Sequence, residues 1–194
     1  MSATEVLMAG FGGQGMLLAG KILAHAAMDA GLEVSWLPSY GPEMRGGTAN
    51  VLVCISEQPI GAPLISSPRG LVVMNLPSLE KFAPTVKPGG LIVVNATLIE
   101  KDPERPDCAV IKVDSREVAE QVGNKRGSNL VMLGVYVGAT EAVPAEAVEQ
   151  AIAETSAAER EAAAAERERL QEEQVAEVEQ VRESAAGEAM QRLT

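Results

Sequence analysis

A glycine-rich turn near the N-terminus constrains the fold of this chain more than any other feature. Residues 10–15 read GFGGQG, which matches the spacing G-x-G-x-x-G, and they lie between a short apolar run and a helix-like run. Gly10 would let the chain leave a strand sharply, and Gly12 and Gly13 would let the backbone approach a ligand or another chain. A strand, a glycine turn and a helix predict the start of an α/β domain, with helix N–H groups able to face an anion.

Strand-like and helix-like runs alternate through the first 152 residues. Apolar runs predict strands at 5–10, 33–37, 48–56, 70–75, 91–95 and 109–114, and helices are predicted at 16–30, 76–86, 115–123 and 128–139. This alternation predicts an open, mostly parallel sheet with flanking helices and a Rossmann-like start. Ligands on such sheets bind at the carboxyl ends of the strands. We therefore expect the glycine turn and a long loop at 38–47 to meet at one edge.

The C-terminal part of the chain has a different composition. Residues 145–194 hold 13 acidic and 5 basic residues, whereas residues 1–144 hold 14 and 11. Ala145 to Arg182 contains no glycine or proline, and its Ala, Glu and Arg residues favour helix. We predict an α/β domain at 1–152 and an acidic Ala/Glu/Arg-rich helical tail at 153–194. The tail is either a solvated single helix or partly disordered, or it is a contact helix for a partner subunit.

The glycine turn alone does not predict a dinucleotide. A dinucleotide-binding fold also needs an acidic residue at the end of its second strand, where it binds the ribose. Here Glu33 begins that strand, the strand ends in LPSY, and Gln14 puts a bulky polar side chain into the turn. NAD and FAD are therefore disfavoured. Another phosphate ligand and a purely structural turn remain as alternatives.

Composition argues against several other classes. The two cysteines form no CxxC motif and there is a single histidine, so no disulfide, metal site or iron–sulfur cluster is expected in this chain. A net charge of −11 and an aromatic content of 3% argue against nucleic acid. No stretch approaches the roughly 20 apolar residues of a membrane span. We expect a soluble, cytoplasmic protein with reduced thiols.

A second motif, PSYGPEMRGGTAN, begins at residue 38. It places Tyr40, Glu43 and Arg45 among glycines and prolines, and polar groups on a rigid loop suit recognition. Arg45 could bind a carboxylate or phosphate through two parallel hydrogen bonds. An internal ion pair of Arg45 with Glu43 or with another acidic residue is the alternative.

The two motifs together resemble a known family. GFGGQGMLLAGKILAHAA, followed by PSYGPEMRGGTANVLVCIS, closely resembles the gamma subunit or domain of 2-oxoacid:ferredoxin oxidoreductases. The resemblance continues through LVVMN, KPGGLIVVN and GSNLVMLGVYVGA, and it covers residues 4–152. The second motif looks most like the 2-oxoglutarate and branched-chain oxoacid types. The tail departs from the family pattern, which leaves its subunit contacts open.

The resemblance implies a role in a hetero-oligomeric enzyme. The assembled enzyme would decarboxylate a 2-oxoacid, with 2-oxoglutarate favoured, transfer the acyl group to coenzyme A and reduce ferredoxin. This chain lacks a GDG-type diphosphate–magnesium motif and a cluster-binding cysteine run. Thiamine diphosphate, Mg²⁺ and the iron–sulfur clusters are therefore expected in the alpha, beta and ferredoxin-like subunits. This chain would be structural, and could assist coenzyme A binding.

The resemblance also implies site residues, none of them catalytic or metal-binding. Candidate contacts to coenzyme A or another phosphate are Gly12, Gly13, Gln14, Gly15 and Arg45. Candidate interface residues are Ser39, Tyr40, Gly41, Pro42, Glu43, Arg45, Gly46 and Gly47. The competing hypotheses are a standalone nucleotide-binding α/β protein and an adaptor that works through the tail.

Five further polar residues have less specific roles. Asn75 and Asn95 each end an apolar strand, where they could form turns or reach the ligand edge. Lys125 and Arg126 could touch phosphate or belong to a solvated loop. His25 has no identified catalytic partner, so a structural or surface role is expected.

Overall fold

The computed structural model describes residues 3–40, 48–61 and 65–158, together with Glu161, Glu166 and Arg169. The chain divides into two compact units, residues 1–152 and 153–194, and each is described by itself.

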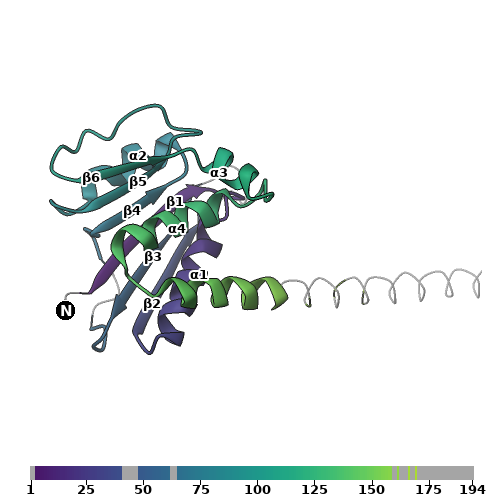
Figure 1. The fold of residues 1–194 in the computed structure, drawn as a ribbon. Coiled ribbons are helices and arrows are strands. Elements are labelled where there is room, and N and C mark those ends of the chain that lie inside the picture. Colours follow the sequence, from purple (N-terminus) through teal and green to yellow (C-terminus); the bar gives the residue numbers. More distant parts are fainter. Residues whose placement is uncertain are drawn as a thin grey trace, which may run out of the picture. The chain divides into compact units, whose positions relative to one another are not determined.

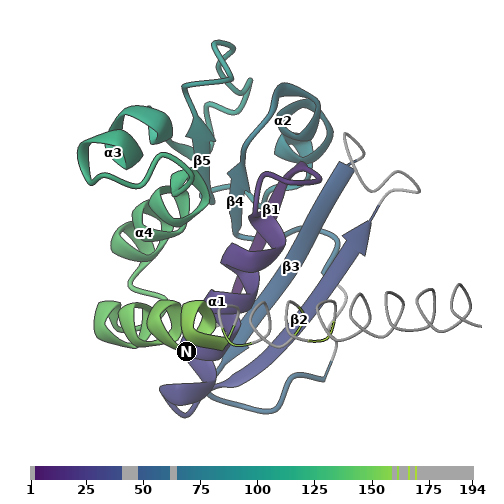
Figure 2. The ribbon, with the colours of Figure 1, turned by 90° about the vertical axis from the view of Figure 1, so that its right-hand side faces the viewer.

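Six strands of the first unit form one sheet in the order β2-β3-β1-β4-β5-β6. Figure 2 shows β5, β4, β1, β3 and β2 in this order from left to right. The pairings of β1 with β4, β4 with β5 and β5 with β6 are parallel, which confirms the expected mostly parallel sheet. The strands are β1 (Thr4–Phe11), β2 (Glu33–Tyr40), β3 (Thr48–Ser56), β4 (Gly70–Val73), β5 (Leu91–Asn95) and β6 (Ala109–Val113).

The sheet differs from a simple Rossmann start at β3. Strands β1 and β2 are connected through helix α1 (Met16–Asp29), but β3 lies between them and is antiparallel to both. Strand β2 also continues through Pro38 to Tyr40, so the predicted strand end at residue 37 was three residues early. Because β2 is an edge strand, it tolerates a proline that cannot donate a hydrogen bond.

Helices cover both faces of the sheet. Helix α1 and helix α4 (Ser128–Thr140) lie on one face of the sheet, and helix α2 (Leu76–Phe82) lies on the other (Figure 1). Gly31, with φ of 77°, follows the end of α1 as expected for a helix stop. The side chain of Asn75 caps the start of α2, and the side chain of Asp114 caps the start of α3 (Ser115–Gln121). A 3-10 turn at Ala83–Thr85 follows α2, and a further helix is formed by residues 145–158.

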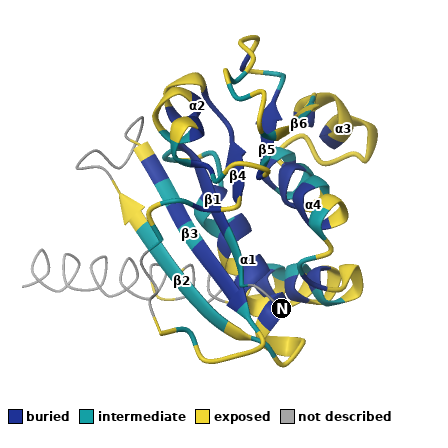
Figure 3. Cartoon of the chain, turned by 90° about the vertical axis from the view of Figure 1, so that its left-hand side faces the viewer, coloured by how far each residue is buried: buried dark blue, intermediate teal, exposed yellow. Residues whose placement is uncertain are grey.

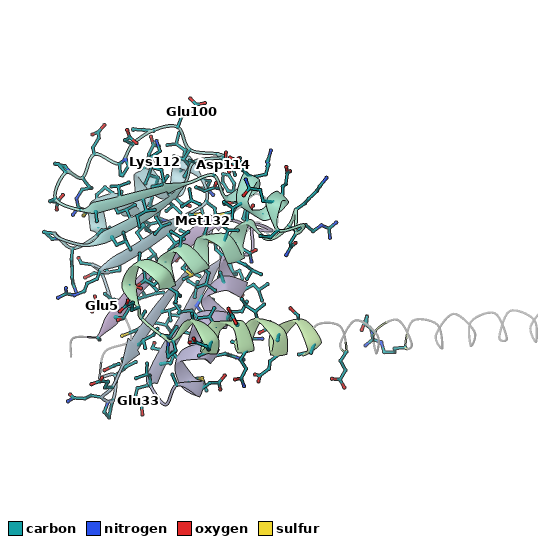
Figure 4. The ribbon with its side chains drawn as sticks, in the orientation of Figure 1. Glu5, Glu33, Glu100, Lys112, Asp114 and Met132 are labelled. Atoms are coloured by element: carbon teal, nitrogen blue, oxygen red, sulfur yellow. The ribbon has the colours of Figure 1, made fainter. Side chains whose placement is uncertain are left out.

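Alternation along the strands feeds two apolar cores. Val6 and Met8 of β1 face α1 and α4, whereas Leu7 and Ala9 face α2. The fully buried Met132 extends from α4 into the first of these cores (Figure 4). Figure 3 shows how burial decreases from the central strands to β2, whose end is exposed. Burial on both faces explains why the central strands are continuous apolar runs.

The described part of the second unit is helical. Arg169 donates to the Glu166 carboxylate at 3.2 Å, the i,i+3 spacing that helps an isolated helix. The rest of the predicted tail helix beyond residue 158 lies outside the described residues. Among the described residues, no helix combines the length and apolar character needed to cross a bilayer.

Candidate anion-binding site at the sheet edge

The glycine turn and the second motif begin at the same edge of the sheet. Phe11, at the end of β1, pairs with Thr48 of β3, and Ala49 of β3 pairs with Tyr40 of β2. The turn therefore lies beside Thr48, which follows the segment 41–47, whereas Tyr40, which precedes that segment, lies one strand further away. That segment lies outside the described residues, so the roles expected for Gly41, Pro42, Glu43, Arg45, Gly46 and Gly47 stay predictions.

The glycines of the turn meet two different requirements. Gly13 and Gly15 have φ values of 95° and 75°, a region that other residues rarely adopt. Gly10 still belongs to β1, and a Cβ there would lie 2.7 Å from Oε1 of Gln14. The chain thus leaves the strand only after Phe11, and Gly10 is needed for close packing instead of a sharp exit. Gly12 lies in the turn and is half-buried.

Gln14 closes the turn from inside. Its Oε1 accepts a hydrogen bond from the backbone N–H of Phe11 at 2.6 Å and one from Nδ2 of Asn75 at 3.2 Å. Because a backbone N–H can only donate, this contact fixes which end of the Gln14 amide is the oxygen. The side chain links the turn to the end of β4, a role that sequence reasoning did not predict.

Asn75 and Asn95 organise the ends of β4 and β5. Asn75 Oδ1 accepts from the Ser78 backbone N–H at 2.9 Å and so caps α2. Asn95 Oδ1 accepts from Ser115 Oγ at 2.9 Å and from the Thr97 backbone N–H at 3.1 Å. Both residues are buried. They shape the local turns at the carboxyl ends of β4 and β5, and Asn95 also lines a pocket there, whereas a contact of either residue with a ligand stays a prediction.

A pocket of about 400 Å³ opens at this edge. This is within the usual size range of small-molecule sites. Its lining comes from the glycine turn, the ends of β4 and β5, and the starts of α3 and α4. The lining residues are Gly13, Gln14, Met74, Asn95, Thr97, Leu98, Ser115, Arg116, Arg126, Ser128 and Asn129.

The charges around the pocket favour an anion. Arg116 and Arg126 are the charged residues among those that line it, and both are exposed. Helices α1 and α4 both begin next to the pocket. Among the described residues, no side chain caps either helix start by accepting a hydrogen bond from its first N–H groups. Helix N–H groups without a side-chain cap among the described residues, together with guanidinium groups, suit a phosphate or carboxylate.

Asn129 and Asp114 fix the surroundings of the pocket. Asn129 donates from Nδ2 to the carbonyl of Gly15 at 3.1 Å, which joins α4 to the glycine turn. Asp114 accepts from Thr97 Oγ1 at 2.7 Å and from the Glu117 backbone N–H at 3.1 Å. These hydrogen bonds, the Thr97 bond first, lower the pKa of the Asp114 carboxyl below its ordinary value.

Sequence reasoning found only part of this site. Gly13, Gln14, Asn95 and Arg126 line the pocket, but Arg116 and Asn129 were missed. The isolated asparagine in the apolar run that forms α4 was a usable signal for Asn129. Arg116 had no such signal, because an arginine near a helix start is common on any surface.

Other candidate residues lie elsewhere. Ser39 lines a different hollow with Leu37 and Asn50, and Tyr40 is 68% exposed. His25 is exposed on α1, as expected. Both cysteines are free, and burial raises the pKa of the Cys54 thiol. The described residues contain no group of three His, Cys, Asp or Glu side chains placed to hold a metal ion.

Comparison with known proteins decides the family. The family model described as pyruvate ferredoxin/flavodoxin oxidoreductase matches residues 5–169. The chain belongs to this family. Together with the solved gamma subunit described below, this match confirms the resemblance to gamma subunits expected from the two motifs.

Three relatives show how the family domain is used. Ketoisovalerate oxidoreductase subunit VorA of Methanothermobacter marburgensis is 42% identical over 69% of this chain, which spans only 28% of VorA. 2-Oxoglutarate synthase subunit KorC of Methanocaldococcus jannaschii is 36% identical over 78% of this chain and 82% of KorC. The solved keto/oxoacid ferredoxin oxidoreductase gamma subunit of Geobacter sulfurreducens is 32% identical, with a TM-score of 0.65 over 77% of this chain and 84% of that one.

Proposed function

We propose that this chain is the gamma subunit of a multi-subunit 2-oxoacid:ferredoxin oxidoreductase. The assembled enzyme decarboxylates a 2-oxoacid oxidatively, forms the acyl-CoA and reduces ferredoxin. The family match supports this proposal, and so do the relatives that are named as subunits of such enzymes. Alpha and beta subunits supply thiamine diphosphate and Mg²⁺, and a ferredoxin-like subunit supplies iron–sulfur clusters.

2-Oxoglutarate is the proposed substrate. The second motif and the match to KorC along most of its length support it. The relatives are also named for ketoisovalerate and pyruvate. Ferredoxin reduction by the purified complex should therefore be compared with all three oxoacids. A higher kcat/KM for pyruvate or ketoisovalerate would overturn the choice of 2-oxoglutarate.

We further propose that the pocket at the sheet edge binds the phosphate groups of coenzyme A. The observation that carries this proposal is the convergence of Arg116, Arg126 and two uncapped helix starts on one pocket beside the glycine turn. The amide of Gln14 adds a donor, since its oxygen is already engaged. These groups would hold and orient the cofactor, while its thiol accepts the acyl group at the partner subunits.

Steady-state kinetics of the assembled complex test the coenzyme A site. Arg116→Ala, Arg126→Ala and Arg45→Ala should each raise the apparent KM for coenzyme A and leave the KM for the oxoacid unchanged. Arg69→Ala is the matched control, because Arg69 is exposed just before β4, at the opposite end of that strand. Unchanged KM values for coenzyme A in all three variants would exclude this pocket as a coenzyme A site. The loops at this edge of the sheet would then serve only as a subunit interface.

Equilibrium dialysis of the isolated chain tests the competing hypothesis. The proposed subunit should not bind NAD or FAD tightly and should show no turnover alone. The insertion of β3 between β1 and β2 supports this expectation, because it separates the end of β2 from the glycine turn. Tight binding of a dinucleotide would favour a standalone nucleotide-binding protein instead.

A further inference from the structure

An apolar groove runs between α4 and the segment that follows it. It has a volume of about 680 Å³ and is lined mainly by Leu130, Gly134, Val137, Gly138, Val148 and Ile152. We call it the α4 groove. It is separate from the pocket at the sheet edge, which the first turn of α4 lines through Ser128 and Asn129.

Two glycines that line the α4 groove have no close neighbour among the residues that the structure describes. Gly134 and Gly138 are one helical turn apart and exposed, and a Cβ at either position would meet nothing within 4 Å. In contrast, a Cβ on Gly20 would lie 2.5 Å from Val51 Cγ1. Glycine weakens a helix interior relative to alanine. Two exposed glycines one turn apart leave room for another backbone to come close.

The charge along this part of the chain is of one sign. Residues 128–152 contain three glutamates and no lysine or arginine. Two of these glutamates, Glu141 and Glu149, line the α4 groove and are exposed. An occupant that is apolar at its centre and basic at its flanks would match both the lining and the charge.

We propose that the α4 groove receives an α-helix of another subunit of the oxidoreductase. This helix has small or apolar side chains where it crosses Gly134 and Gly138, and it has Lys or Arg opposite Glu141 and Glu149. The inference rests on the proposed function, because it requires a multi-subunit enzyme. The inference adds two things to the proposed function: the surface of this chain that contacts the other subunit, and the chemistry of the helix that binds there.

Glycine substitutions separate docking from folding. The affinity of the full-length chain for the co-purified alpha and beta subunits is measured by titration, and the Tm of the chain is measured alone. Gly134→Ala with Gly138→Ala should raise the Tm by better helix propensity, yet weaken assembly. Gly134→Leu with Gly138→Leu should weaken it further, by at least about tenfold. Ala139→Leu, on an exposed site of α4 outside the groove, is the control and should assemble normally.

Charge variants provide an independent test. Glu141→Lys with Glu149→Lys should weaken assembly, most strongly at low salt, because exposed charges are screened as ionic strength rises. Assembly of the leucine pair with wild-type affinity would overturn the inference. Self-association of the isolated chain that the leucine pair abolishes would also overturn it, since the occupant would then be a second copy. Failure of the wild-type chain to assemble would count against the proposed function itself.

Discussion

Close packing around single glycines holds the α/β unit together. Gly70, at the start of β4, lies against the ring of Tyr136 from α4, and Tyr136 is fully buried. A Cβ at Gly70 would lie 2.7 Å from Cε2 of this ring. Sequence reasoning placed Gly70 in a strand but could not find its partner, because the contact joins residues 66 positions apart in the chain.

Gly70→Ala should therefore destabilise the chain. Overpacking of a buried site costs about 1–3 kcal/mol in free energy of unfolding. Urea denaturation of the two proteins measures the difference. Gly61→Ala is the control, since a Cβ there would meet no described atom within 4 Å, and it should change the stability by less than about 0.5 kcal/mol. Equal stability of Gly70→Ala and the parent would contradict the packing described here.

Asp114 should carry a pH dependence. Its pKa is lower in the folded chain because the Thr97 hydroxyl and the Glu117 N–H donate to the charged form. A lowered pKa in the folded state stabilises the protein above the unfolded value of about 4, and this stabilisation is lost as the pH falls through the folded pKa. An NMR titration should find the Asp114 carboxyl below its ordinary value. Thr97→Val should move the pKa upward, and an unchanged value would exclude this cause.

At the scale of elements, the positions of the strands and helices along the chain were largely predictable. Which of these elements lie side by side in the fold was not predictable. Apolar runs bounded by glycine, proline and asparagine locate all six strands, because burial on both faces removes polar residues from the central ones. The position of β3 between β1 and β2 depends on pairing between distant segments, which local patterns do not contain. The pocket was unpredictable for the same reason, since it combines the glycine turn with the starts of α3 and α4.

The start of α2 offers a test at this scale. Asn75→Ala removes both the cap of α2 and the hydrogen bond to Gln14, so the free energy of unfolding should fall by about 1–2 kcal/mol. Asn75→Asp keeps the cap acceptor but loses the donor to Gln14. Thermal unfolding should rank the parent first, aspartate second and alanine last. An alanine variant as stable as the parent would show that neither bond matters.

For the whole molecule, the main question is what the tail adds to the family domain. The family model extends to residue 169, whereas the compact α/β unit ends at 152. Deletion of residues 153–194 should leave the folding of the first unit intact, because its two apolar cores are formed by residues before 153. Circular dichroism should show loss of helix signal without a lower Tm.

The same deletion also separates two roles for the tail in the assembled enzyme. A solvated helix predicts that the shortened chain still enters the complex with alpha and beta subunits. An adaptor helix predicts that assembly is lost although the shortened chain is folded. Gel filtration of the co-expressed subunits, with the full-length chain as reference, distinguishes the two.

The antiparallel pairing of β3 with both neighbours has a consequence for engineering. Both stems of the 41–47 segment are held in register, Tyr40 by Ala49 and Thr48 by Phe11. A one-residue slip would turn the buried face of β3 outward, so the sheet resists it. Changes of length or sequence between these stems must then be absorbed within the segment. We therefore expect an exchange of this segment with that of a relative to leave the register of β3 unchanged.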